Sequence, residues 1–155
     1  MGLIKILSPG VPGFSFVKEG ADYYLKKLKS LGKVELIFPK IKVKGSSPEL
    51  RLKAEEEAFR KHLKTQDYLI VLDERGKLFK TLEFTKHLEN LMLSHSSIVF
   101  LIGGPEGVSK NLKNEAKELL SLSTLTLNHE IALLVLLEAL YRGFTILKGI
   151  PYHRE

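Results

Sequence analysis

Apolar runs of strand length alternate along the chain with longer segments in which apolar residues recur at helical spacing. Uninterrupted apolar runs, such as the one at 68–72, are typical of strands buried inside a parallel sheet. The pattern predicts strands at residues 3–7, 34–38, 68–72 and 97–102, with 121–127 a strand or an extended loop. It predicts helices at residues 14–31, 48–63, 82–93, 111–120 and 129–142. We therefore expect an α/β fold with a mostly parallel sheet flanked by helices, in a single domain spanning residues 1–155.

Residues at the predicted boundaries have the chemistry of caps and turns. Ser47, Thr81 and Asn128 precede helices, where a side-chain oxygen can accept a hydrogen bond from a free backbone N–H. Pro48 and Pro105 suit a first helical turn, and residues 73–76 are expected to form a turn.

The helix at 129–142 is apolar nearly all round, and such a helix has to be covered on more than one face. A subunit interface is one way to cover it.

Charge and composition narrow the function classes. The net charge is +6, and residues 1–66 carry 14 Lys/Arg against 7 Asp/Glu, whereas residues 67–155 carry 10 against 11. A basic half can attract a polyanion such as RNA, although solvated lysines on helix faces explain the same count. The chain has no cysteine, which removes thiolate metal sites and cysteine nucleophiles and fits a cytoplasmic setting. Its five histidines lack metal-ligand spacing, and no apolar run is long enough for a membrane span.

Three segments follow predicted strands, at the edge of a parallel sheet where ligands bind. They are residues 72–76, 103–107 and 122–127. Gly103 and Gly104 allow a ligand to approach the backbone closely, but they also suit a plain strand-to-helix turn. Residues 122–127 alternate small polar and apolar groups, which can line a pocket or form a half-buried strand. Neither a dinucleotide fingerprint nor a phosphate loop is present, so a nucleoside triphosphate is poorly supported.

The polar tail contains Tyr152, His153 and Arg154, which can stack on a base, move a proton and hold a phosphate. A frayed chain end is the plainer explanation. Arg142 ends the predicted apolar helix, where a cation complements the helix dipole and can also contact substrate.

Five segments in this order resemble one family: LDERGK at 72–77, FLIGGPEG at 100–107, SLSTLTLNHE at 121–130, EALYRG at 138–143 and PYHRE at 151–155. The chain resembles the ribosomal RNA large subunit methyltransferase H family, the pseudouridine N3-methyltransferases of the SPOUT superfamily. The resemblance extends along essentially the whole chain. It departs from the family at Leu133, Ala139 and Asn128, where arginine, glutamine and proline are common in relatives.

The resemblance implies a C-terminal trefoil knot, a homodimer and S-adenosylmethionine (SAM) as cofactor. The substrate it implies is a pseudouridine of 23S rRNA within the ribosome. It assigns cofactor binding to Leu72, Gly103, Leu122, Ser123, Thr124, Leu125, Thr126 and Leu127. It assigns substrate binding and catalysis to Tyr152, His153, Arg154 and Arg142.

The sequence therefore predicts a SAM-dependent rRNA methyltransferase without a metal and without a membrane segment. Two other functions were weighed against it. A non-enzymatic RNA-binding module explains the basic half but leaves the strand-end loops and the tail without purpose. An NAD- or nucleotide-binding enzyme would need the phosphate-binding motif that the chain lacks.

Overall fold

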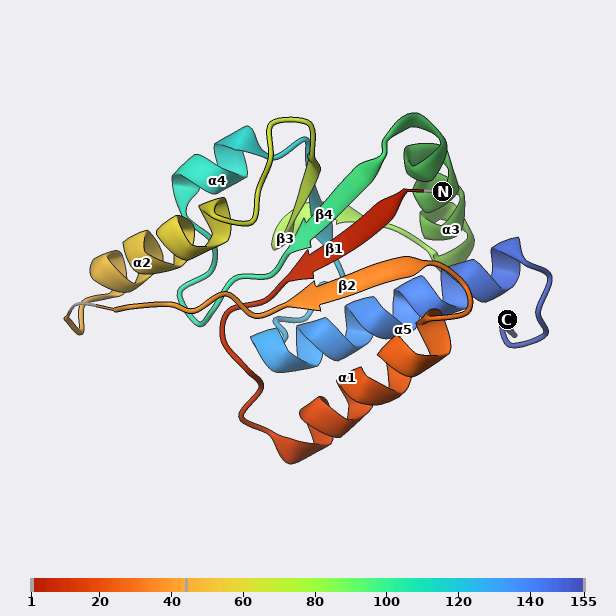
Figure 1. Ribbon diagram of the computed structural model, residues 1–155, viewed down its shortest axis with the longest axis horizontal. Helices are drawn as coiled ribbons and strands as arrows, with labels where there is room; N and C mark the ends of the chain where they lie inside the picture. Colours follow the sequence, from red (N-terminus) through yellow and green to blue (C-terminus); the bar gives the residue numbers. More distant parts are fainter. Residues whose placement is uncertain (1, 44, 155) are drawn as a thin grey trace.

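All strands of the computed structural model run parallel in one sheet of five, with the order β2-β1-β4-β3-β5 across the described residues, 2–43 and 45–154 (Figure 1). The strands are β1 (Leu3–Leu7), β2 (Lys33–Ile37), β3 (Tyr68–Leu78), β4 (Ser97–Leu101) and β5 (Glu118–Ser121). The helices are α1 (Ser15–Leu28), α2 (Pro48–Arg60), α3 (Thr81–Ser94), α4 (Lys110–Glu115) and α5 (His129–Leu147). The predicted α/β class with a mostly parallel sheet is confirmed.

Helices cover both faces of the sheet, so the strands are apolar on both sides. Alternate residues of β4 show the division: Ile98 and Phe100 belong to the core beneath α1, α3 and α5. Val99 and Leu101 belong to a smaller core that includes Phe59 of α2. This two-sided burial explains why the central strands are continuous apolar runs rather than alternating ones.

Helix α5 is the central helix of the larger core. It contacts α1 and α3 as well as the sheet. Leu133, Leu136, Leu137 and Leu140 have no exposed surface, and Val135 is 36% exposed. The chain itself therefore supplies much of the cover that the apolar composition of this helix requires. Leu133, one of the positions at which the chain departs from the family it resembles, lies in this core and not on the surface.

Several predicted boundaries are wrong where one pattern fits two structures. Residues 73–76 are not a turn, because β3 continues to Leu78 with a break in its pairing to β5 between Leu72 and Lys77. The helix expected at 111–120 stops at Glu115, and Leu119 and Leu120 join the sheet as part of β5. Of the two alternatives for 121–127, the loop is observed over residues 122–127, and only Ser121 belongs to a strand. Helical and strand spacing cannot be told apart over so few apolar residues.

The predicted caps have mixed outcomes. Ser47 and Asn128 accept hydrogen bonds from the backbone N–H groups of Leu50 and Glu130 at 3.1 and 2.8 Å, as expected. Thr81 is the first residue of α3 and not its cap, which is Lys80. Pro105 does not enter a helix, because α4 begins five residues later behind Ser109.

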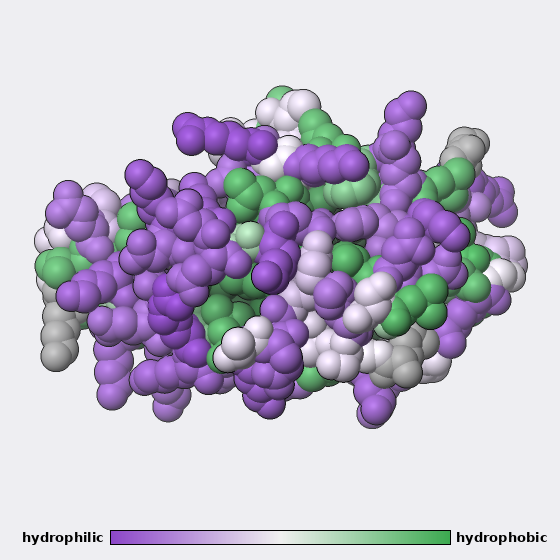
Figure 2. All heavy atoms as spheres, turned by 90° about the horizontal axis from the view of Figure 1, so that it is seen from above, coloured by the Kyte–Doolittle hydropathy of each residue, from purple (hydrophilic) through white to green (hydrophobic). Residues whose placement is uncertain are grey.

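The surface seen in Figure 2 is mostly hydrophilic, and hydrophobic residues appear there only as small groups among polar ones. No helix in the described part of the chain has the length and apolar character needed to cross a membrane.

Shortening single side chains of α5 should have different effects on stability on its buried and its exposed side. We expect Leu137→Ala to lower the free energy of unfolding by about 2–5 kcal/mol, because it leaves a cavity in the core. Val135→Ala, on the exposed side of the same helix, should cost about 1 kcal/mol or less. Urea unfolding measures both, and equal losses would contradict the packing described for α5.

Candidate functional site

A pocket of about 550 Å³ opens beyond the ends of β4 and β5, beside the stretch of β3 where its pairing to β5 is interrupted. Its walls are residues 72–75 of β3 and the loops that follow β4 and β5, which parallel strands bring to one side of the sheet. Of the predicted cofactor residues, those that line the pocket are Leu72, Gly103, Leu122, Ser123, Leu125, Thr126 and Leu127. Thr124 is exposed and lies outside the lining residues. The volume is within the range of small-molecule sites.

The glycine loop at 103–107 folds back on itself beside the pocket. The Gly107 N–H donates to the Gly104 carbonyl at 2.9 Å, and Gly107 has a φ of 80°. A Cβ on Gly103 would lie 2.5 Å from the carbonyl carbon of Gly107, so a side chain there would collide with backbone. Gly103 and Gly107 therefore serve the tight turn itself, and the turn presents backbone to the pocket.

Polar side chains join the pocket walls, and of these only Thr126 was among the residues predicted to bind the cofactor. Thr126 Oγ1 donates to Glu74 Oε2 at 2.7 Å, which joins the loop after β5 to β3. Lys113 Nζ pairs with Asp73 Oδ2 at 2.8 Å and joins α4 to β3. Burial raises the pKa of Asp73, but hydrogen bonds from Lys113 and the Arg75 N–H outweigh burial and leave the pKa below its usual value. In the sequence, the signal for Asp73 and Glu74 was that two acids directly follow the apolar run at 68–72.

The loop hydroxyls mostly hold the loop itself. Ser121 Oγ donates to the Ser123 carbonyl at 2.9 Å, and the Leu125 N–H donates to Ser123 Oγ at 2.9 Å. Carboxylates outnumber cations around the pocket, with Asp73, Glu74 and Glu106 against Arg75 and Lys113. The lining therefore suits a ligand that carries positive charge. No three His, Asp or Glu side chains of the described residues meet in a group that could hold a metal.

The tail packs against α5, so over its described residues it is not a frayed end. Tyr152 Oη donates to Glu138 Oε2 at 2.7 Å, and the Arg142 guanidinium lies over the Tyr152 ring at 4.6 Å. Arg142 Nη1 lies 3.1 Å from His153 Nδ1. Because a guanidinium only donates, this contact places the proton of a neutral His153 ring on Nε2. Arg154 is exposed, and Glu155 lies outside the described residues.

Glu138 is the centre of this cluster and was missed, although it precedes Arg142 by one helical turn. Two Arg142 nitrogens donate to its carboxylate at 3.1 and 2.9 Å. The prediction that the helix ends at Arg142 is wrong, because α5 continues to Leu147. Its charge is satisfied by Glu138 rather than by the end of the helix dipole.

The predicted site residues form two groups at opposite ends of α5. His129 and Ala132, in its first turn, line the pocket, whereas Arg142 and the tail cluster lie near its far end (Figure 1). The 13 residues from His129 to Arg142 correspond to about 20 Å along the helix axis. One copy of the chain does not bring the tail to the pocket.

Comparison with known proteins gives one consistent result. The family model described as a predicted SPOUT methyltransferase matches residues 3–153. A protein of Francisella philomiragia is 37% identical over 153 residues, which cover 97% of this chain and 99% of the relative. A protein of Pseudothermotoga lettingae is 39% identical over 138 residues, 89% of this chain and 91% of the relative. A protein of Syntrophomonas wolfei is 39% identical over 156 residues, 97% and 98% of the two chains. All three relatives are named ribosomal RNA large subunit methyltransferase H.

The contact between Tyr152 and Glu138 should appear in a pH titration. The hydrogen bond to the Glu138 carboxylate, with burial, raises the pKa of Tyr152 from 10.0 to about 12. The neutral phenol is therefore favoured in the folded protein, and this contribution to stability is lost as the pH rises through about 12. Glu138→Gln should move the pKa of Tyr152 back toward 10.

Ultraviolet absorbance of the phenolate, taken as the difference from a Tyr152→Phe background, isolates this group among the tyrosines. Glu130→Gln, in the first turn of the same helix, is the matched control and should leave the pKa of Tyr152 unchanged. An unchanged titration in Glu138→Gln would disprove the contact.

Proposed function

Because the chain belongs to the SPOUT methyltransferase family and, within it, to the ribosomal RNA large subunit methyltransferase H family, we propose that it is a SAM-dependent methyltransferase of large-subunit rRNA. The methyl acceptor we propose is N3 of a pseudouridine in 23S rRNA within the ribosome. Family membership over residues 3–153 carries the proposal. The rival idea of a non-enzymatic RNA-binding module does not explain a family of methyltransferases.

The chemistry of the pocket supports SAM as the ligand. Leu72, Leu120 and Leu122 offer apolar surface for an adenosine, and backbone groups of the 103–107 turn are available for hydrogen bonds. The ammonium and carboxylate of SAM balance each other, and its sulfonium leaves a net positive charge, which matches the small excess of carboxylates in the lining. When bound, SAM supplies a methyl group that is already activated on sulfur.

The separation of pocket and tail supports a homodimer with shared sites. The tail cluster lies about 20 Å along α5 from the pocket of its own chain, and a second copy would bring a tail to that pocket without moving the tail from α5. We propose that Tyr152, His153 and Arg154 of one protomer act at the pocket of its partner. The trefoil knot, the single domain over residues 1–155 and the cytoplasmic location remain predictions.

Methylation of the ring nitrogen requires loss of its proton while the new N–C bond forms and the S–C bond breaks, giving S-adenosylhomocysteine. The protein contributes chiefly by positioning the two reactants. His153 is our candidate for handling the proton, and for that role its Nδ1 has to be released from Arg142. Arg154 and Arg142 are candidates for phosphate contact or charge stabilisation, and Tyr152 for orienting the base.

Transfer of a tritiated methyl group from SAM tests the activity. Ribosomes that lack the modification should be methylated, and naked 23S rRNA should not. Calorimetry should show binding of SAM and S-adenosylhomocysteine but not of NAD or ATP. His153→Ala should lower the single-turnover rate by about 10²-fold or more, the size of a general acid–base contribution, while SAM affinity is retained.

An unchanged single-turnover rate in His153→Ala would remove His153 from the proton-transfer step. Failure of SAM to bind would instead contradict the methyltransferase function as a whole.

Mixed dimers test whether the sites are shared. One protomer lacks residues 152–155, and the other carries Gly103→Ala, which blocks the turn beside its pocket. Each parent homodimer should be inactive. The mixed dimer should recover about half of the wild-type activity, because one intact pocket meets one intact tail. An inactive mixed dimer would show that each site is built within one chain.

A further inference from the structure

One stripe of helix α2 faces the glycine loop and α4. Arg51, Glu55, Glu56 and Arg60 recur at the spacing that places side chains on one face of a helix. Each of them contacts a residue between 104 and 115. Helix α2 itself does not line the pocket, so its influence on a ligand is indirect.

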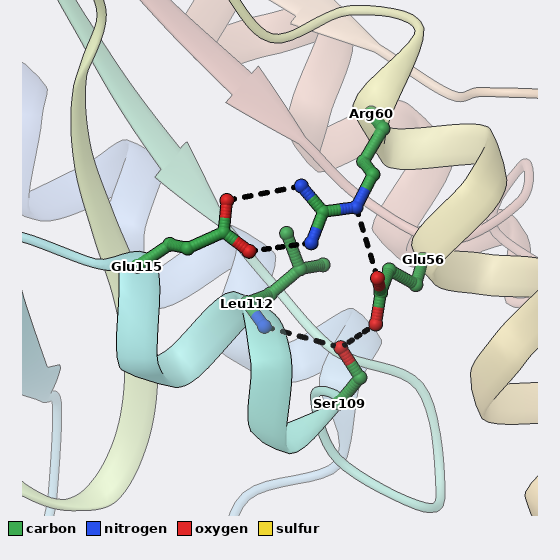
Figure 3. A network of polar contacts seen from close by, with 5 residues as sticks. All are labelled: Glu56, Arg60, Ser109, Leu112 and Glu115. Carbon is green, nitrogen blue, oxygen red and sulfur yellow. Dashed lines mark hydrogen bonds and ion pairs between the residues drawn. The ribbon is translucent and has the colours of Figure 1, made fainter. Parts of the chain in front are cut away.

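The last turn of α2 is fixed to α4 by the polar network in Figure 3. Arg60 binds the Glu115 carboxylate with two nitrogens and donates from Nε to Glu56 Oε2 at 2.9 Å. Ser109 Oγ donates to Glu56 Oε1 at 2.6 Å and accepts from the Leu112 N–H at 3.3 Å. Ser109 is therefore both the cap of α4 and its link to α2. A bidentate ion pair and a shared cap restrict sliding between these helices.

The middle of α2 meets the loop that lines the pocket. Glu55 is 5% exposed, and its Oε2 would lie 2.7 Å from a Cβ on Gly104. Burial raises the pKa of Glu55, while a hydrogen bond from the Gly104 backbone acts in the opposite direction. Its Oε1 has no hydrogen-bond partner among the described residues. Arg51 Nη1 lies 3.7 Å from Glu106 Oε2, two residues beyond Gly104.

A buried carboxyl group with one oxygen that lacks a hydrogen-bond partner lowers the stability of the fold. Its position against a pocket loop therefore suggests a role at that loop. Gly104 has no positive φ, which means that backbone conformation does not demand glycine there. A Cβ at Gly104 would instead meet the Glu55 carboxylate, which would have to shift from its buried position. Glu55 thus both excludes a Cβ at Gly104 and bonds its backbone.

We propose that α2 supports the pocket from outside. Glu55 is the positioning residue: it holds Gly104 and so keeps the 103–107 loop in the conformation that binds the cofactor. The proposal rests on the proposed function only in naming SAM as the ligand. Glu55 acts through Gly104 and does not itself touch the ligand. The network around Ser109 fixes α2 to α4 and thereby holds the backbone of Glu55 in place.

A double-mutant cycle tests the contact, with S-adenosylhomocysteine as the probe in calorimetry on the full chain. Glu55→Ala should weaken binding by about tenfold through loss of the bond to Gly104. Glu55→Gln keeps an acceptor and should bind within about threefold of wild type. Gly104→Ala should also weaken binding, because its Cβ meets the carboxylate. The double variant Glu55→Ala/Gly104→Ala should lose less than the two single effects combined, since the new methyl enters vacated space.

Hydrogen exchange of the protein without ligand gives a second readout. Glu55→Ala should speed amide exchange in residues 103–108 and leave the strands protected as in wild type. Glu57→Ala is the matched control, because Glu57 is exposed on the same helix, and it should alter neither measurement.

Three results would each overturn the proposed role of Glu55. They are wild-type affinity in Glu55→Ala, strict additivity in the cycle, and faster exchange throughout the chain. If the wild-type protein binds no S-adenosylhomocysteine, the proposed function fails. The exchange comparison then still decides whether Glu55 holds the loop.

Discussion

The shared direction of the strands is the constraint on which the rest of the structure depends. Because β3, β4 and β5 are parallel, the loops that follow β4 and β5 leave the sheet beside the stretch of β3 whose pairing to β5 is interrupted, and these three segments meet around one pocket. Parallel pairing requires each strand to be reached by a crossover, and the helices that make those crossovers cover both faces. The pocket is thus a consequence of topology before any of its side chains is considered.

Polar contacts between side chains fix the segments around the pocket relative to one another. Thr126 binds Glu74, Lys113 binds Asp73, and Glu55 lies against Gly104. Each contact joins segments that are distant in sequence, and each involves an acid near the pocket. Two of these acids, Asp73 and Glu74, also belong to the carboxylates that line the pocket and outnumber its cations, although the chain as a whole is basic. Wall rigidity and ligand charge preference therefore come from the same few residues.

Helix α5 relates the pocket to the tail. Its apolar faces bury it in the larger core, so its length separates His129 at the pocket from Arg142 at the tail. Glu138 and Arg142 then hold Tyr152 and His153 against that far end. The proposed dimer follows from this separation, because a helix packed on several sides cannot bend to bring its ends together.

Hydrophobic patterning alone determined the α/β class, the positions of β1, β2, β4 and the apolar first part of β3, and the loop after β4, because buried strands and strand-ending glycines leave local signals. It did not determine the short α4, the continuation of β3 through residues 73–76 or the end of α5. For α4 and β3, one spacing suits both helix and strand, and the pairing of β3 with β5 decides. Only the tertiary structure revealed the contacts of Asp73, Glu74, Lys113, Glu138 and Glu55, because the sequence around a charged residue does not indicate which residue it will pair with. Only it showed that the tail and the pocket lie apart, because that distance depends on how the whole of α5 is packed.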